Sequence, residues 1–350
     1  RRRHTRCLSD WSSDVCSSDL PFVVPNVLGE GASGSTGWAD VANIIPWNLY
    51  LSYGDPKILA DQYASMKAWV EYMQSKSQQD LWNTGFHFGD WLFYRPFDDN
   101  DGRSAVTDKS LIAQCFWAHS TLLLLKAANV LGKQEDIDKY SQMLQRIKKA
   151  FVKEYLTPNG RLVSGTQTAY VLALQFDMLP EELRAQAADR LEENIKSYGN
   201  HLSTGFLGTP YLCHVLTRFG KDDMAYQLLL QESYPSWLYP VKMGATTIWE
   251  RWNGIRTDSS FEPASMNSFN HYAYGAIGDW MAFVAGQLYI AARLAVKLAF
   301  WASETALLQG QFAHAGYTAR RLPAWPESAA AEALDSGYTF ASTSPPPEAP

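Results

Sequence analysis

Two consecutive stretches decide the fold class: TDKSLIAQCFWAHSTLLLLKAANVLG at residues 107–132 and QEDIDKYSQMLQRIKKAFVKEYL at residues 134–156. In both, apolar residues recur at the spacing of one helix face. The first stretch opens at Thr107 and closes at Gly132, and glycine readily adopts the left-handed conformation that ends a helix. Because the second stretch begins within two residues of that glycine, the pair predicts a helical hairpin.

Similar helical patterns extend outward from this hairpin in both directions. The further expected helices lie at residues 40–54, 56–77, 166–179, 180–199, 209–220, 222–233 and 268–286. Strand-like alternation is scarce, so we predict an all-α fold. Hairpins stack either into an open solenoid or around a closed toroid. The chain has no fixed short repeat, and long loops rich in polar and aromatic residues follow one end of successive hairpins. This pattern favours a closed α/α barrel with its site on the loop face.

The composition restricts the class of partner. The 350 residues are 46% hydrophobic and 19% charged, with a formal net charge of −6. Nucleic acids and anionic membranes reward basic surfaces, so we predict neither as a partner. The most apolar stretch, residues 288–308, carries Arg293, Lys297 and Glu304, and we therefore do not expect it to span a bilayer.

Cysteine and glycine patterns give no sign of a metal or cofactor. Cys115 and Cys213 lie in apolar helical contexts and are predicted to be buried thiols. No CxxC pair, phosphate-binding loop, dinucleotide fingerprint or GxSxG elbow is present. We predict that the protein uses no cofactor and binds no metal.

Four loop stretches carry the residues suited to chemistry: GWAD (37–40), FGDWL (88–92), GATTIWERW (244–252) and SMNSFNHYAYGAIGDW (265–280). Each joins a glycine, an aromatic ring and a hydrogen-bonding side chain. Polar side chains can bind sugar hydroxyls, while aromatic rings cover the apolar face of a sugar. The mixture therefore indicates a carbohydrate site.

Residue chemistry alone leaves ordinary structural roles open at these positions. Glu250 lies between Trp249 and Trp252, where apolar surroundings raise the pKa of a carboxyl group, but it could also be a solvated residue near a helix start. His271 could be a hydrogen-bonded core histidine. The other candidates have equally ordinary alternatives, as helix caps or loop ligands for the carboxylates and as core residues for the rings: Asp40, Asp90, Trp38 and Trp91.

Several motifs resemble, in order, those of bacterial α-L-rhamnosidases of glycoside hydrolase family 78. The matching segments are STGWADVANIIPWNLYLSYGD, TQTAYVLAL, GNHLSTGFLGTPYL, AYQLLLQESYPSWLYPVKMGATTIWERWNG and SFNHYAYGAIGDWM, which together span about residues 21–286. The resemblance implies an (α/α)6 barrel that removes terminal α-L-rhamnose with inversion at the anomeric carbon. The implied partner is a rhamnose-containing glycoside, oligosaccharide or polysaccharide, and the implied location is periplasmic or secreted.

The same resemblance implies roles for individual residues. Glu250 corresponds to the general base, Trp38 and Trp91 to the lining of the rhamnose pocket, and His271 to a ligand of sugar hydroxyls. We add Asp40, Asp90 and Trp249 from the same clusters as candidate sugar-binding residues.

The family pattern places the general acid in an acidic, Arg-containing segment upstream of GWAD, and residues 1–20 occupy that position here. Residues 1–20 resemble a translated sequencing adaptor, so we predict them to be disordered and non-native. Residues 21–287 are expected to form a partial catalytic domain that lacks its first helices. Residues 288–350 are expected to form an Ala-rich, off-pattern or disordered tail that ends in STSPPPEAP.

Three functions follow from this organisation. The first is a glycosidase fragment that is inactive because the general-acid segment is missing. The second is a carbohydrate-binding α/α module without catalysis. The third is a helical scaffold for protein partners, which the repeated pairing of aromatic rings with glycine and carboxylates disfavours.

Overall fold

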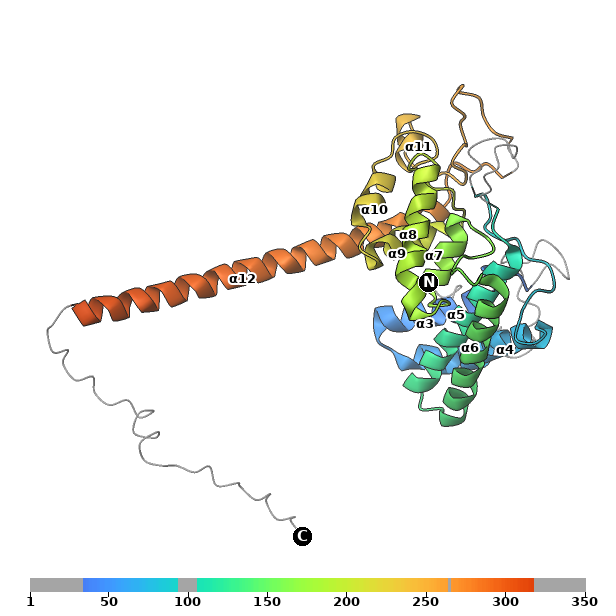
Figure 1. Ribbon diagram of the computed structural model, residues 1–350, viewed down its shortest axis with the longest axis horizontal. Coiled ribbons are helices and arrows are strands. Elements are labelled where there is room, and N and C mark those ends of the chain that lie inside the picture. Colours follow the sequence, from blue (N-terminus) through green and yellow to red (C-terminus); the bar gives the residue numbers. More distant parts are fainter. Residues whose placement is uncertain (1–33, 94–105, 264–265, 318–350) are drawn as a thin grey trace, which may run out of the picture. The chain divides into compact units, whose positions relative to one another are not determined.

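The computed structural model describes residues 34–93, 106–263 and 266–317 (Figure 1). Contacts divide the chain into two units, Arg1–Ala282 and Phe283–Pro350. The predicted disordered segment, residues 1–20, lies outside the described residues.

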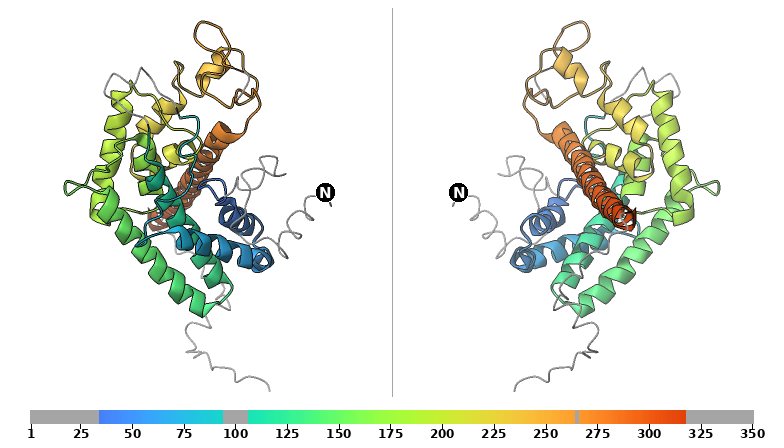
Figure 2. Two further views of the ribbon diagram at one scale, coloured as in Figure 1. Left: turned by 90° about the vertical axis from the view of Figure 1, so that its right-hand side faces the viewer. Right: turned by 90° about the vertical axis from the view of Figure 1, so that its left-hand side faces the viewer.

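Helical hairpins make up the first unit. Their helices are α3 Val41–Tyr53, α4 Pro56–Lys76, α5 Lys109–Val130, α6 Gln134–Tyr155, α7 Gln167–Gln175, α8 Glu181–Ser197, α9 Thr209–Arg218 and α10 Asp222–Leu229. Consecutive helices pack in pairs, α3 with α4 through α9 with α10, and the pairs follow one another side by side (Figures 1 and 2). Since the described residues contain no strand, only isolated bridges, the all-α prediction is confirmed.

The hairpins form two layers. The first helices of successive pairs, α3, α5, α7 and α9, contact one another in that order, and α9 contacts the 3-10 helix η3 (Ala273–Ala276). Helix α7 is buried at every position except Gln175, as its uniformly apolar sequence requires of an inner helix. By contrast, α6 buries a single stripe, formed by Tyr140, Met143, Ile147, Phe151 and Tyr155. It therefore lies in the outer layer, with its polar face in solvent.

Local sequence signals set the helix ends where they were predicted. Pro56 occupies the first turn of α4, and the Asp55 side chain caps that helix by accepting a hydrogen bond from the Lys57 N–H at 2.9 Å. Gly132 has a φ of 65° and follows α5, as the left-handed stop predicted from the sequence. Cys115 and Cys213 are buried free thiols, which confirms the prediction for both.

The last predicted helix, residues 268–286, differs from the structure at both ends. Helix α12 runs from Ile277 to Tyr317. It cannot begin near residue 268, because Ser268 O and the His271 N–H are bonded to the backbone of residues 250 and 248, both at 2.8 Å. It does not end at Gly286, since the Ala- and Leu-rich sequence beyond has high helix propensity. Part of the predicted tail is therefore helical.

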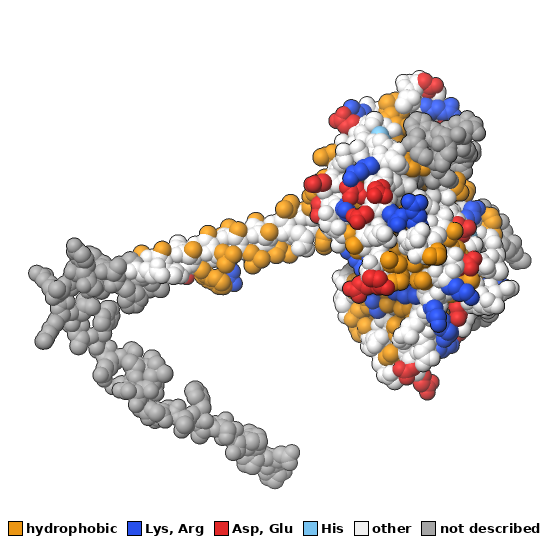
Figure 3. Space-filling view, in the orientation of Figure 1, with side chains coloured by type: hydrophobic (Ala, Val, Ile, Leu, Met, Phe, Trp, Pro, Cys, Tyr) orange, Lys and Arg blue, Asp and Glu red, His pale blue; other side chains and the backbone are white. Residues whose placement is uncertain are grey.

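Two described helices are long and apolar enough to cross a membrane: α5, and the segment Ala273–Leu307 that runs into α12. In α5, 78% of the apolar window is buried inside the protein, which makes it a core helix. The window in Ala273–Leu307 is not buried at all, and its hydrophobic side chains are visible along the long helix in Figure 3. The absence of a membrane partner stays a prediction from the charges in this segment.

Candidate active site

The four sequence clusters gather where inner helices begin. Asp40 immediately precedes α3, Thr168 lies in the first turn of α7, and Gly208 immediately precedes α9. The loop that contains Asp90 bonds to the starts of both α7 and α9. The loop that contains Glu250 reaches the same region, because the indole N–H of Trp252 donates to the Thr204 carbonyl at 3.3 Å.

Glu250 is held from one side by the backbone of Ser268. The Ser268 N–H donates to Glu250 Oε2 at 2.8 Å, and the Glu250 N–H donates to the Ser268 carbonyl at 2.8 Å. The residue is only 9% exposed. One carboxylate oxygen is therefore fixed by a backbone donor, and no hydrogen bond to Oε1 joins it to another described residue.

Both indoles beside Glu250 are buried, but they face different neighbours. Trp249 packs edge-on against Phe269 at a centroid distance of 5.1 Å. Trp252 stacks on Tyr274 at 3.9 Å and meets Trp237 edge-on at 5.5 Å. Trp249 is 4% exposed, and its predicted contact with sugar stays a prediction.

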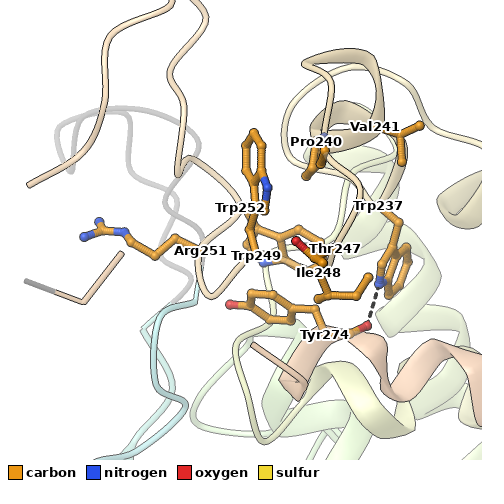
Figure 4. A pocket seen from close by; sticks show the side chains of 10 residues that line it. Trp237, Pro240, Val241, Thr247, Ile248, Trp249, Arg251, Trp252 and Tyr274 are labelled. Atoms are coloured by element: carbon orange, nitrogen blue, oxygen red, sulfur yellow. Dashed lines mark hydrogen bonds between the residues drawn. The ribbon is translucent and has the colours of Figure 1, made fainter. Parts of the chain in front are cut away.

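A small apolar hollow of about 30 Å³ lies beside this loop (Figure 4). Its lining includes Trp237, Ile248, Trp249, Trp252 and Tyr274. Glu250 does not line it. The hollow is small and its lining is mostly apolar, so it offers a sugar little hydrogen bonding.

Asp90 is buried at 4% exposure and accepts four hydrogen bonds. Its Oδ1 accepts from the N–H groups of Leu207 at 2.8 Å and Gly208 at 3.1 Å. Its Oδ2 accepts from the Gly205 N–H at 2.7 Å and from the Thr168 hydroxyl. Burial raises the pKa of Asp90, while these donors act in the opposite direction. The four bonds tie Asp90 to the 203–208 loop and to α7, and its predicted contact with sugar stays a prediction.

Asp40 is also buried and also accepts four bonds. Oδ1 accepts from the Trp69 indole at 3.0 Å and from the Ser120 hydroxyl at 2.5 Å. Oδ2 accepts from the Gly37 N–H at 2.7 Å and the Thr36 hydroxyl at 3.5 Å. Burial raises the pKa of Asp40, and these donors oppose the shift. Like Asp90, Asp40 ties its loop to neighbouring helices.

The predicted platform residues are half-buried and connected through rings that the sequence analysis did not single out. Trp38 lies 4.5 Å from Phe88, and Phe88 lies 5.3 Å from Trp91, measured between ring centroids. Each of the three rings keeps part of its surface exposed. A Cβ on Gly37 would lie 2.6 Å from Leu207, so GWAD and the 203–208 loop are in direct contact.

His271 joins the same aromatic surface. Its ring stacks on Phe206 at 5.0 Å and is half-buried. The Ala273 N–H donates to Nδ1 at 3.2 Å, so the neutral ring carries its proton on Nε2. The histidine can therefore present an N–H donor to a hydroxyl group.

Tyr274 connects the loops, and the sequence analysis did not identify it. Its hydroxyl donates to the Leu92 carbonyl at 2.7 Å, and its carbonyl accepts from the Trp237 indole at 2.9 Å (Figure 4). Burial raises its pKa well above the ordinary value. The motif NHYAYG offers two tyrosines and no signal to choose between them: Tyr272 is 86% exposed and Tyr274 is 1% exposed.

No group of three or more His, Cys, Asp or Glu side chains within residues 34–93, 106–263 and 266–317 is arranged to hold a metal ion. The site consists of one carboxylate fixed from one side, one histidine donor and a partly exposed aromatic surface.

Two layers of hairpins, with these loops at the starts of the inner helices, define an α/α-toroid type of domain. The family model for the bacterial alpha-L-rhamnosidase 6 hairpin glycosidase domain matches residues 2–284. The chain belongs to this family.

Individual relatives agree with this assignment. The chain is 47% identical over 280 residues to an alpha-L-rhamnosidase of Formosa agariphila, a match that covers 78% of this chain and 30% of that protein. Streptomyces avermitilis alpha-L-rhamnosidase complexed with L-rhamnose has a TM-score of 0.72 at 42% identity, covering 79% of this chain and 26% of that one. Native alpha-L-rhamnosidase from Aspergillus terreus has a TM-score of 0.71 at 37% identity, covering 78% and 32%. The chain thus spans about a third or less of these relatives' length.

Proposed function

We propose that this domain removes terminal α-L-rhamnose from a glycoside or polysaccharide by an inverting mechanism, with Glu250 as the general base. The observation that carries the proposal is the Glu250 carboxylate, bonded through Oε2 to the Ser268 N–H, in a loop that meets the half-buried rings. The names of the relatives, and the L-rhamnose in one of their structures, support the choice of sugar.

In an inverting glycosidase, one carboxyl group protonates the leaving oxygen and one carboxylate takes a proton from the attacking water. The two carboxyl groups stand roughly 6.5–9.5 Å apart so that the water fits between base and sugar. Glu250 suits the base role, because the Ser268 N–H fixes Oε2 and leaves Oε1 to accept the proton.

The sugar is proposed to lie on Trp38 and Trp91, with the Nε2–H of His271 donating to a hydroxyl group. Asp40 and Asp90 act indirectly in this proposal. Each of the two carboxylates accepts four internal hydrogen bonds. These bonds hold GWAD, through Asp40, and FGDWL, through Asp90, in place beneath the proposed sugar.

The first prediction concerns Glu250. In the Glu250→Gln variant the side chain can no longer accept a proton from water, so turnover of an activated aryl α-L-rhamnoside should fall by about 10²–10⁴-fold. Activated aryl leaving groups need little acid help, so the assay isolates the base. Glu193→Gln, on the exposed face of α8, is the matched control and should retain the parent rate.

The stereochemistry gives an independent check. NMR of the first-formed rhamnose should show the anomer opposite to that of the substrate. A retained configuration, or equal measurable rates for Glu250→Gln and the parent chain, would contradict the assignment. The expectation that this chain alone is inactive stays a prediction, and the parent rate in the same assay tests it.

A non-catalytic carbohydrate-binding module is the second candidate. It is favoured by the internal commitment of Asp40 and Asp90, which leaves Glu250 as the carboxylate of the predicted set with a free oxygen among the described residues. Calorimetric titration with L-rhamnose separates the candidates, because saturable binding without turnover supports the module.

A further inference from the structure

A second hollow lies away from the Glu250 loop, between α6 and the turn that joins α7 to α8. It has a volume of about 390 Å³ and is open to solvent. Its polar lining consists of Lys148 and Lys149 from α6, Asp177 from the turn and Arg184 from α8. Asp177 follows the C-terminal end of α7, whereas the active-site residue Thr168 lies at its N-terminal end, so the two regions lie at opposite ends of this helix.

Asp177, the carboxylate that lines the hollow, already forms ion pairs with two arginines. Asp177 Oδ1 lies 3.0 Å from an Arg184 nitrogen and 2.6 Å from an Arg218 nitrogen. Arg184 also donates through Nε to the Leu179 carbonyl at 3.0 Å. These bonds fix the Arg184 guanidinium at the wall of the hollow and use the negative charge of Asp177.

Lys148 has no such partner. Within the described part of the chain, no hydrogen bond, ion pair or ring contact to its ammonium group is present, although the side chain is half-buried. Burial lowers its pKa; Asp177 opposes this shift, and Arg184 and Arg218 add to it. A half-buried cation beside two arginines creates a positive potential that an anion would relieve.

The start of α8 adds donors at the same place. Leu179 and Pro180 line the hollow, and α8 begins at Glu181 without a side-chain cap. The Leu183 N–H donates to the Pro180 carbonyl at 3.0 Å, and no side chain caps the N–H groups of Glu181 and Glu182. Glu181 and Glu182 occupy that first turn, but both are exposed and neither lines the hollow.

We propose that this hollow binds an oxyanion, a phosphate, sulfate or carboxylate group, with Lys148 as its principal ligand and Lys149 and Arg184 beside it. The site is independent of rhamnose hydrolysis. Its occupant is either a free inorganic oxyanion or an acidic group carried by a saccharide chain.

Calorimetry on the full chain tests the proposal, with inorganic phosphate, inorganic sulfate and glucuronate as separate probes and sodium chloride at matched ionic strength as the reference. Saturable binding of at least one probe is expected. Phosphate or sulfate as the tightest probe identifies a free oxyanion, whereas glucuronate identifies an acidic sugar. No saturable binding of any probe overturns the proposal.

The variants decide whether Lys148 is the ligand. Lys148→Gln should weaken binding by about tenfold or more, because it removes a charge-assisted hydrogen bond, while Lys148→Arg keeps the charge and should bind within a few-fold of the parent. Lys153→Gln removes a cation from the exposed face of the same helix and should have no effect. Equal binding by Lys148→Gln and the parent overturns the proposal. If Lys148→Gln fails to fold, an NMR titration of the parent replaces it: the pKa of Lys148 must rise when the anion binds, and an unchanged pKa contradicts the site.

Discussion

A buried carboxylate is stable only where donors satisfy its lone pairs, and Asp90 meets this requirement with groups that are far apart in the sequence. The donors Gly205, Leu207 and Gly208 lie more than a hundred residues away. The bonds therefore define where the 203–208 loop lies relative to FGDWL. They also explain why the sequence could nominate Asp90 for the site but could not distinguish a sugar ligand from a positioning residue.

Replacing Asp90 with asparagine should be costly. The amide nitrogen would face N–H donors and leave some of them unsatisfied, so we expect Asp90→Asn to lower the free energy of unfolding by about 2–4 kcal/mol at neutral pH. Urea denaturation measures this difference. Asp138→Asn is the control, because Asp138 is exposed and its one side-chain bond, accepted from Gln134, survives the change. Similar losses in the two variants would show that the Asp90 network contributes little.

The close packing around Gly205 leads to a second prediction about a single residue. A Cβ there would lie 2.3 Å from the Trp91 carbonyl oxygen and 2.8 Å from the Phe93 nitrogen, and backbone atoms cannot move aside as a flexible side chain can. Gly205→Ala should therefore lower the thermal midpoint and displace Trp91, with a change in tryptophan fluorescence. Gly165→Ala is the matched variant, since a Cβ there meets nothing within 4 Å. Equal midpoints for the two variants would contradict the close approach of the loops.

Among the elements, the helices with clear start and stop signals were predicted to within a few residues, and the last helix was not. Asp55 with Pro56, and Gly132, are signals that act within one turn of the chain. The start of α12 depends instead on long-range bonds between residues 268–271 and 248–250, which no local pattern reveals. The same distinction separates Tyr274 from Tyr272, because the Tyr274 hydroxyl bonds to a residue 182 positions away.

The ion pair between Glu192 of α8 and Lys221, which precedes α10, leads to a prediction about how stability depends on pH. Bonds from Lys196 and Lys221 to Glu192, at 2.5 and 2.9 Å, lower the pKa of Glu192 below its ordinary value of 4.5. A lowered folded-state pKa contributes stability that is present above pH 4.5 and is lost as the pH falls through the folded value. The contribution should be about 0.5 kcal/mol, because the group is partly solvated.

Urea denaturation of the parent and Glu192→Gln at neutral pH and near pH 3 measures this contribution. The parent should be more stable at neutral pH, and the difference should shrink at acid pH. Glu193→Gln, one residue along and exposed, should show no such change with pH. If the difference in stability between the parent and Glu192→Gln grew as the pH fell, the expected direction of the pH dependence would be wrong.

For the whole molecule, the sequence could predict the class of fold and the clustering of the loops, because the glycine- and aromatic-rich motifs lie between the helical stretches. It could not predict that Asp40 and Asp90 are internally satisfied or that Trp249 is buried, since these properties depend on how the hairpins are stacked. The cationic hollow was missed for a similar reason. Its charged residues come from two helices and a turn, and each is an ordinary surface residue in the sequence.

The segment beyond Ala282 leads to the last prediction. In the first turns of α12, Trp280 is buried and its indole donates to the Thr217 hydroxyl at 2.9 Å. From residue 287 to 307 every side chain is exposed, and many are large and apolar (Figure 3). Exposed apolar surface of this kind promotes self-association and adds nothing to the core. Ending the chain after residue 287 should therefore leave the free energy of unfolding within about 0.5 kcal/mol of the parent value.

Light scattering tests the expected self-association, and urea denaturation tests the expected stability, each on the parent and on the shortened chain. The shortened chain should remain monodisperse at concentrations where the parent associates, and its cooperative transition should keep the parent midpoint. A Trp280→Ala variant of the shortened chain provides the contrast: it removes a buried indole and its hydrogen bond, so it should lose about 3–5 kcal/mol. If shortening alone caused a loss of that size, the removed residues would have to contribute to the stability of the hairpin unit, and the exposure of residues 288–307 would need another explanation.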